Sequence, residues 1–318
     1  MSNVNNELED FFNLIFTDVE KKIDDTIDDD TIKDILKGGK RLRSLLAHLA
    51  FKTCTMGKET KEQSDRSLEG TVSIELAHGA SLVHDDIIDK DLERRGEPAF
   101  HVKEGIGKAL LVGHRMLTKG FHIALSHGQE VAKLYVESWE EVVNGEIDEV
   151  EFNKNGNGKN LSKSELFDSY NKIIDLKTAV LFSSACKAGV LEANMSGDIV
   201  KVFGDYGREI GLAYQLADDL VDLVKGEILD SVVLPLVNQI KGTKQKFGFL
   251  KKRKVKKMFV KNKDEIKDFY VSEIKKHLYK AKELSNSEII PKSEYKTLLS
   301  VAPHYIINKM LADIKMTV

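Results

Sequence analysis

Two short acidic motifs in the sequence have the same spacing. In each motif, a pair of adjacent aspartates is followed by two aliphatic residues and a third aspartate, at Asp85, Asp86 and Asp89 and again at Asp218, Asp219 and Asp222. Residues four apart lie on the same face of a helix, where like charges repel by about 0.2–0.5 kcal/mol unless something neutralises them. The spacing therefore predicts that each motif binds a cation.

Carboxylate oxygens in this number select a hard cation. Mg²⁺ is held in proteins by one or two carboxylates together with water and the oxygens of a bound phosphate. If the two motifs face each other across a helical bundle, their six carboxylates share one cavity, and the charge must be neutralised there. We therefore predict Mg²⁺ that bridges both motifs to a diphosphate. A single motif of this kind is more often a solvated acidic patch, so the prediction depends on the second copy.

Basic and polar side chains suited to a diphosphate occur in further segments. "GGKRLR" carries Lys40 and Arg43 after a glycine pair, which allows a tight turn, and both are expected at the start of a helix. The other candidates are His78, Arg94, Arg95, Lys177 and Thr178. Each of them alone has an ordinary explanation, because cations near helix ends stabilise the helix dipole and most histidines on a helix face are structural.

Long helices must position these groups. The chain has only four prolines, and apolar residues recur with helical spacing around both aspartate motifs and over residues 162–191. Ser162 and Glu165 form a capping-box sequence that predicts the start of a helix. The breaks between the helical segments are too short for interdomain linkers. We therefore expect residues 1–318 to be a single all-α domain, a large helical bundle.

The composition is that of a folded protein without general affinity for nucleic acid. The 318-residue chain has 42% hydrophobic residues, a formal net charge of -3 and a pI of about 6.3, and an acidic pI disfavours nucleic acid as a partner. Cys54 and Cys186 are too few for a zinc cluster or a disulfide framework. No apolar run approaches the ~20 residues of a membrane span. We expect a soluble cytoplasmic protein.

Five segments, taken together and in this order, resemble the trans-isoprenyl diphosphate synthase (polyprenyl synthetase) family, in particular archaeal-looking short-chain members of the geranylgeranyl diphosphate synthase type. They are "GGKRLR", "ELAHGASLVHDDIID", "RRGEPAFH", "LKTAVLF" and "GLAYQLADDLVD". The resemblance implies an all-helical bundle around a deep central cavity, usually as a homodimer. It also implies a prenyltransferase that joins isopentenyl diphosphate head-to-tail to an allylic diphosphate and releases pyrophosphate. Three Mg²⁺ ions per active site are expected with substrate bound.

The same resemblance assigns roles to single residues. Ionisation of the allylic C–O bond needs a neutralised leaving group, which the aspartates with Mg²⁺, Arg94 and Lys177 would provide. Thr178 and Gln215 would flank the carbocation, and the released pyrophosphate would take the final proton.

A second set of residues resembles the pocket for isopentenyl diphosphate. It consists of Lys40, Arg43, His78 and Arg95. Cationic side chains of this kind hold phosphates directly, without a metal ion.

Three features depart from the family pattern. "VGHRM" has Gly113 and His114 where the family usually has Gly-Asp. The segment after Asp222, "LVKGEILDSVVLPLV", is shortened and lacks the usual lysine, for which Lys225 is a possible substitute. The basic run Lys251–Lys257 has no counterpart in the family; it is either a solvated surface segment or a contact for anionic lipid headgroups, at most a peripheral membrane contact.

Product length is predicted from the residues that precede the first motif. In the family, the growing prenyl chain extends along this helix, and a bulky residue five positions before the first aspartate stops it. The sequence has Ala80 there, preceded by Gly79. Small residues favour a product of twenty carbons (geranylgeranyl) or twenty-five carbons (geranylfarnesyl) over one of fifteen.

Three alternatives remain open on the sequence alone. The chain could be a non-catalytic partner subunit of an active synthase, which the shortened segment favours and the intact aspartates disfavour. It could be a class I terpene cyclase, but these enzymes usually replace the second aspartate motif and lack "GGKR". A purely structural helical protein would leave the coincidence of the five segments unexplained.

Overall fold

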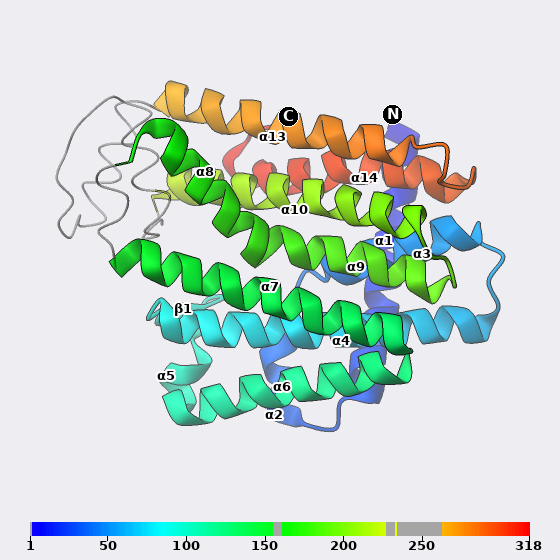
Figure 1. Cartoon of the computed structure of the whole chain (residues 1–318), viewed down its shortest axis with the longest axis horizontal. Helices are drawn as coiled ribbons and strands as arrows, with labels where there is room; N and C mark the ends of the chain where they lie inside the picture. Colours follow the sequence, from blue (N-terminus) through cyan, green and yellow to red (C-terminus); the bar gives the residue numbers. More distant parts are fainter. Residues whose placement is uncertain (1, 155–160, 227–232, 234–262) are drawn as a thin grey trace. The chain divides into compact units, whose positions relative to one another are not determined.

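The computed structural model describes residues 2–154, 161–226, 233 and 263–318, and most of them are helical (Figure 1). The predicted all-α fold is confirmed. Within these ranges the only strands are β1 (Glu93–Arg94) and β2 (Glu97–Pro98), a short antiparallel pair. Arg95 and Gly96 between them have φ angles of 55° and 79°, the left-handed conformation that tight hairpin turns require.

The helices belong to two compact units, and each unit combines three stretches of sequence. Unit 1 comprises Met1–Trp139, Ser184–Gly204 and Glu288–Leu299, and unit 2 comprises Glu140–Ser183, Asp205–Ser287 and Ser300–Val318. Each unit is defined by its own contacts. A single domain around a central cavity therefore stays a prediction.

Unit 1 is organised around one long helix, α4 (Lys61–Ile88). The other helices that it contains in full are α1 (Ser2–Thr26), α2 (Asp30–Leu36), α3 (Leu42–Thr55), α5 (Phe100–Glu104) and α6 (Ile106–Ser126). All five contact α4, with α6 in the most extensive contact. Val72 and Leu76 of α4 and Leu49 of α3 are fully buried, so the apolar spacing read from the sequence is the core of this unit.

Unit 2 carries the second motif. Its helices are α8 (Lys163–Ile174), the π-helix η1 (Asp175–Ala179), α13 (Lys263–Ser285) and the 3₁₀ helix η2 (Ala312–Ile314), with parts of α7 (Gln129–Lys154), α9 (Val180–Glu192), α10 (Asp198–Lys225) and α14 (Glu294–Leu311). The capping box that opens α8 is confirmed: Ser162 Oγ accepts from the Glu165 N–H at 3.3 Å, and Glu165 Oε2 accepts from the Ser162 N–H at 2.7 Å. The helix predicted over residues 162–191 is interrupted by the π-helix.

Two features named from the sequence fall outside the described residues. They are the basic run Lys251–Lys257 and most of the shortened segment after Asp222. Among the described helices, none is both long and apolar enough to cross a lipid bilayer.

Candidate active site

The first aspartate motif lies at the C-terminal end of α4. Asp85 and Asp86 belong to the last turn, and Asp89 is the C-cap, with its N–H donating to the Asp85 carbonyl at 2.8 Å. Asp86 is buried, Asp85 is half-buried and Asp89 is exposed. The three carboxylates therefore have different surroundings although they share one motif.

Arg94 neutralises the buried aspartate of the first motif. Its Nε donates to Asp86 Oδ1 at 2.8 Å, its Nη2 contacts the same oxygen, and Asp91 Oδ2 lies 3.7 Å from Nη2. Burial alone would lower the pKa of the Arg94 guanidinium, but the hydrogen bond and the charge of Asp86 outweigh burial and raise that pKa. The β1–β2 hairpin thus brings a permanent cation to the first motif.

The two glycines before Lys40 serve different purposes. Gly38 has a φ of 76°, in the left-handed region that glycine adopts without strain. Gly39 provides space, because a Cβ there would lie 2.7 Å from Nη1 of Arg41. The side chain of Arg41 folds back over the turn and passes through that space.

Lys40 lies outside α3. Arg41 has a φ of 54°, which is incompatible with a right-handed helix, so α3 begins only at Leu42. The prediction that Lys40 and Arg43 both start the helix is therefore wrong for Lys40, whereas Arg43 lies in the first turn. The side chain of Lys40 is exposed and that of Arg43 is half-buried.

A buried ion-pair network holds this turn in place. Arg41 Nε lies 2.5 Å from Glu20 Oε1, and its Nη1 lies 2.9 Å from Glu75 Oε2. Its Nη2 donates to the Leu36 carbonyl at 2.7 Å, and Ser44 Oγ donates to the second oxygen of Glu75 at 2.5 Å. Arg41 and Glu75 are 4% and 2% exposed, so each charge depends on the other for its solvation.

The sequence analysis missed both Arg41 and Glu75. One signal was available: Glu75 interrupts the apolar run "VSIELAHGA", and an acid at a core position of a helix needs a partner. The identity of that partner was not readable, because Arg41 is one of several cations in the segment.

Cations surround His78. Its half-buried ring has an Nδ1 that is inaccessible and has no hydrogen-bond partner among the described residues. Burial, followed by the charges of Arg43, Arg95, Arg41 and Arg94, holds the pKa of His78 well below its ordinary value, so the imidazole is neutral. Four cations around a neutral ring make this part of unit 1 suited to an anion.

Arg95 anchors the other end of the glycine turn. Its Nη1 donates to the Lys37 carbonyl at 2.5 Å. Its pKa is lowered by burial and by repulsion from Arg41 and Arg94. Arg94 and Arg95 therefore differ: the first is compensated by Asp86, and the second lies in net positive surroundings. A cavity of about 810 Å³ in unit 1 is lined by both arginines, Asp86 and Lys37 among others.

In unit 2, the middle aspartate of the second motif accepts hydrogen bonds from two neutral side chains. Asp219 is buried, its Oδ2 accepts from the Tyr170 hydroxyl, and its Oδ1 accepts from Gln215 Nε2 at 2.9 Å. Thr178 Oγ1 donates to Gln215 Oε1 at 2.8 Å. The two residues predicted to flank a carbocation, Thr178 and Gln215, are thus linked to each other and to the second motif.

The protonation of Asp219 differs from that of an ordinary aspartate. Burial raises its pKa to about 7, and the neighbouring charges of Asp218 and Asp222 add to the rise. The hydrogen bonds from Tyr170 and Gln215 act in the opposite direction without cancelling it. Asp219 therefore keeps its proton to a higher pH than an ordinary aspartate does.

Lys177 lies in the π-helix η1 and is paired with two glutamates of α7. Its Nζ lies 2.9 Å from Glu146 Oε1 and 2.5 Å from Glu149 Oε2. The sequence analysis missed these glutamates and Tyr170. The spacing "EIDE" on a helix, which places two acids three apart on one face, was a signal for the first two.

Lys225, named as the substitute for the missing lysine, ends α10, and its Nζ lies 3.4 Å from Asp313 Oδ2. Both side chains are largely exposed, so this pair contributes little stability.

The six aspartates of the two motifs are divided between the units, three in each. In the part of the chain that the structure describes, no three His, Cys, Asp or Glu side chains are grouped closely enough to hold a metal ion. Each motif does offer two aspartates four residues apart, at the end of α4 and on α10. Their carboxylate oxygens fit a hard divalent cation that takes its remaining ligands from water and substrate. A cluster of six carboxylates stays a prediction.

The residues predicted to set product length are tightly packed. Ala80 is fully buried. A Cβ on Gly79 would lie 2.5 Å from Met116 Cε and 2.7 Å from Leu36 Cδ2. Glycine at position 79 therefore does not leave an opening, because Met116 and Leu36 occupy the space.

The Gly113–His114 departure has a local explanation. A Cβ on Gly113 would lie 2.3 Å from Nε2 of His84, the residue before the first motif. The rings of His84 and His114 pack edge to face with centroids 5.3 Å apart. His114 therefore contacts the helix of the first motif from α6.

A protein-family model matches the part of the sequence that carries the candidate site. The model of the family described as "Polyprenyl synthetase" matches residues 26–229, which include both aspartate motifs. The chain belongs to this family. The match contains every site residue proposed from the sequence.

Curated relatives are similar over part of their length. The chain is 32% identical to the geranylgeranyl diphosphate synthase of Methanosarcina mazei over 60% of this chain and 56% of the relative. It is 33% identical to the short chain isoprenyl diphosphate synthase of Methanothermobacter thermautotrophicus over 65% of this chain and 64% of the relative. It is 28% identical to the geranylfarnesyl diphosphate synthase of Methanosarcina mazei over 59% of each. The matches thus span between 56% and 64% of these relatives.

A solved structure shares the fold. The decaprenyl diphosphate synthase of Rhodobacter capsulatus superposes with a TM-score of 0.79 and 20% sequence identity, covering 96% of this chain and 99% of that one. At this identity the similarity concerns the fold alone.

Proposed function

We propose that this protein condenses isopentenyl diphosphate head-to-tail with an allylic diphosphate to make an all-trans prenyl diphosphate, with Mg²⁺ as the metal. The observation that carries the proposal is the pairing of each aspartate motif with its own polar partners: Asp86 with Arg94, and Asp219 with Tyr170 and Gln215. Membership of the polyprenyl synthetase family supports it.

The aspartates four apart in each motif would hold the metal. Asp85 and Asp89 share one face at the end of α4, and Asp218 and Asp222 share one face of α10. Mg²⁺, in three ions per active site, would supply positive charge to the leaving diphosphate. The middle aspartates, Asp86 and Asp219, would hold the outer ones in place through their protein partners.

The cations near each motif would share this task. Arg94 is held at the first motif by Asp86, and Lys177 is held by Glu146 and Glu149 until an anionic substrate competes for it. When the allylic C–O bond breaks, its electron pair stays on the diphosphate, whose negative charge increases. Cations that are already in position therefore stabilise the transition state more than the ground state.

Thr178 and Gln215 would face the developing carbocation. Thr178 donates its hydroxyl hydrogen to Gln215, so its oxygen lone pairs remain available to stabilise positive charge. Neither side chain is a strong base, so the released pyrophosphate would accept the final proton.

Isopentenyl diphosphate would bind near the glycine turn of unit 1. Lys40, Arg43 and Arg95 would hold the diphosphate there directly, and His78 would donate to it as a neutral imidazole. The network of Arg41, Glu20 and Glu75 would keep this turn rigid.

The product would have twenty or twenty-five carbons. Ala80, with its small side chain, and the names of the two Methanosarcina mazei relatives support this range. Met116 and Leu36, which fill the space beside Gly79, are candidates for part of the floor of the prenyl pocket.

The protein would act as a cytoplasmic homodimer. Apolar side chains on the outside of α6 support a partner surface, since Ile106, Leu111 and Leu125 are 56%, 70% and 50% exposed. Any membrane contact would be peripheral, through the basic run Lys251–Lys257.

The test is to incubate the purified protein with Mg²⁺, labelled isopentenyl diphosphate and dimethylallyl, geranyl or farnesyl diphosphate, and to size the dephosphorylated products. We expect one dominant product of twenty or twenty-five carbons. Asp85→Ala and Asp218→Ala should abolish it, whereas Asp205→Ala, an exposed aspartate of α10, should not. Absence of product with every primer would contradict the proposal and favour the partner-subunit alternative.

A further inference from the structure

The π-helix η1 is an irregularity inside an otherwise regular helical run. The N–H of Val180 donates to the carbonyl of Asp175, five residues earlier, so one extra residue is accommodated in the turn. Such turns are rare, and they are frequently found at functional sites. Each residue of an α-helix advances about 100° around the axis, so the extra residue changes the direction in which Lys177 and Thr178 point relative to α9.

Two glycines of neighbouring helices in unit 2 pack closely against this turn. A Cβ on Gly145 of α7 would lie 2.8 Å from Leu176 Cβ and 3.1 Å from the backbone nitrogen of Lys177. A Cβ on Gly211 of α10 would lie 2.6 Å from Ala179 Cα. Apart from Cγ of Lys177, 3.0 Å from the Cβ on Gly145, the nearest atoms are backbone or Cβ atoms, which cannot swing aside. Only glycine therefore permits either approach.

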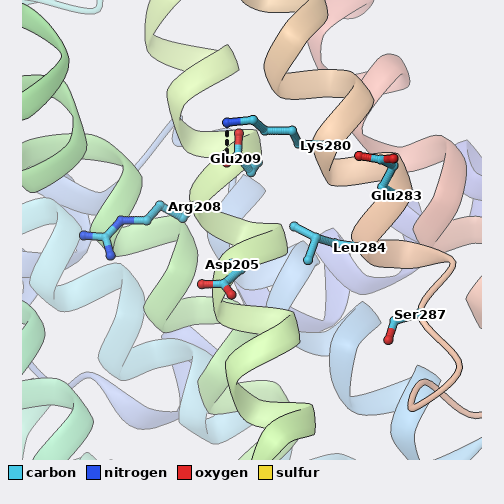
Figure 2. Close-up of a pocket in the computed structure, with 7 residues that line it drawn as sticks. All are labelled: Asp205, Arg208, Glu209, Lys280, Glu283, Leu284 and Ser287. Carbon is cyan, nitrogen blue, oxygen red and sulfur yellow. Dashed lines mark ion pairs between the residues drawn. The ribbon is translucent and has the colours of Figure 1, made fainter. Parts of the chain in front are cut away.

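A charged brace holds the start of the same turn. Arg208 Nε donates to Asp175 Oδ1 at 2.6 Å, and its Nη2 donates to Glu141 Oε2 at 3.0 Å. Arg208 also lines a groove of about 630 Å³ between α10 and α13, and Figure 2 shows its guanidinium pointing away from the other labelled side chains of that groove. Its partners are on η1 and α7, not in the groove.

We propose that Gly145, Gly211 and Arg208 are positioning residues that hold η1 as a π-helix and thereby aim Lys177 and Thr178. The two glycines set the distance of α7 and α10 from the turn, and Arg208 fixes its first residue. This inference rests on the proposed function for the roles of Lys177 and Thr178. None of the three positioning residues needs to touch substrate.

The main test compares Gly211→Ala with Gly107→Ala. Both change a helical glycine to alanine, but a Cβ on Gly107 meets nothing within 4 Å. In Gly211→Ala we expect kcat to fall about 100-fold, with KM for both substrates changed less than about threefold, because a small displacement of a catalytic group costs rate rather than binding. Gly107→Ala should keep the wild-type kcat.

Arg208→Met and Arg208→Lys test the brace. Arg208→Met should lower kcat about tenfold, and lysine, which keeps one ion pair to Asp175, should restore part of the loss. A merely structural role predicts a lower melting temperature with unchanged kcat per folded molecule in Gly211→Ala and in Arg208→Met, and this result would overturn the inference.

Crystal structures of the wild type and Gly211→Ala separate this inference from the proposed function. We expect residues 175–179 to lose the π-helical hydrogen bond in the variant, and Lys177 Nζ to move away from Glu146 and Glu149. If the variant keeps both features, the inference fails even when the wild type makes product. If the wild type makes no product, the proposed function fails, and the structures still decide whether glycine maintains the π-helix.

Discussion

The two aspartate motifs read alike in sequence but lie in opposite electrostatic surroundings. The middle carboxylate of the first motif, Asp86, is bound by the Arg94 guanidinium, and this pairing raises the pKa of Arg94. The middle carboxylate of the second motif, Asp219, is bound by a phenol and an amide, and burial raises its pKa to about 7. A shared spacing therefore does not imply shared electrostatic surroundings, because these depend on the partners that packing supplies.

The same contrast extends beyond the motifs. Around the first motif, charges are compensated by charges, as in the buried network of Arg41 and Glu75. Around the second, a hydrogen-bond chain runs from Thr178 through Gln215 to Asp219, next to the π-helix η1. Substitutions that remove one partner should have different consequences in the two regions.

The largest effect is expected from Arg41→Met, which leaves the Glu75 carboxylate buried without its cation. Breaking a buried ion pair on one side costs about 3–5 kcal/mol of unfolding free energy. Urea denaturation followed by circular dichroism measures this loss. The double variant Arg41→Met with Glu75→Gln removes the stranded charge and should recover most of the stability. Equal destabilisation in the single and double variants would contradict a charge-compensated network.

A direct comparison of the middle aspartates comes next. Asp86→Asn removes the charge that holds Arg94, and we expect kcat to fall about 100-fold, as for loss of one preorganised electrostatic group. Asp219→Asn resembles the protonated state that Asp219 already populates, so its kcat should fall only about tenfold. Steady-state kinetics of the two purified variants decide this. Equal losses would remove the distinction between the two regions.

The raised pKa of Asp219 should also make the stability of the protein depend on pH. An aspartate has a pKa of about 3.9 in the unfolded chain, whereas burial raises that of folded Asp219 to about 7. As the pH rises, Asp219 therefore loses its proton in the unfolded chain before it does so in the folded protein. Its contribution to stability is complete below pH ~4 and is lost as the pH rises to about 7. In Mg²⁺-free buffer, the stability of Asp219→Asn relative to the wild type should therefore increase between these pH values. A difference that is independent of pH would show that Asp219 has an ordinary pKa.

The smallest effect concerns the product rather than the rate. Ala80 lies on the helix of the first motif and is fully buried, so Ala80→Phe must take volume from neighbouring space. We expect the main product to shorten by at least one five-carbon unit, measured by chromatography of the dephosphorylated products. Ala109→Phe, at a fully buried alanine of α6, is the control for overpacking alone. An unchanged product distribution would assign the pocket floor to Met116 and Leu36 or to another helix.

Much of the site was predictable because its residues follow local rules. The four-residue spacing in each motif predicts a shared helix face, and the capping box at Ser162 predicts the helix start that the structure has. The packing beside Gly79 was not predictable. A glycine suggested open space, but side chains from α2 and α6 fill it, and neither lies near Gly79 in the sequence.

The sequence by itself determined the helices, the two motifs and the family, because spacing, capping and composition act between residues that are close along the chain. Only the tertiary structure decided which partner each polar group has. Arg41 and Glu75 are 34 residues apart, and Tyr170 and Asp219 are 49 apart. The π-helix likewise depends on glycines of two other helices. Such pairings follow from packing, which selects one partner among several of the same chemical type, and local sequence does not record that choice.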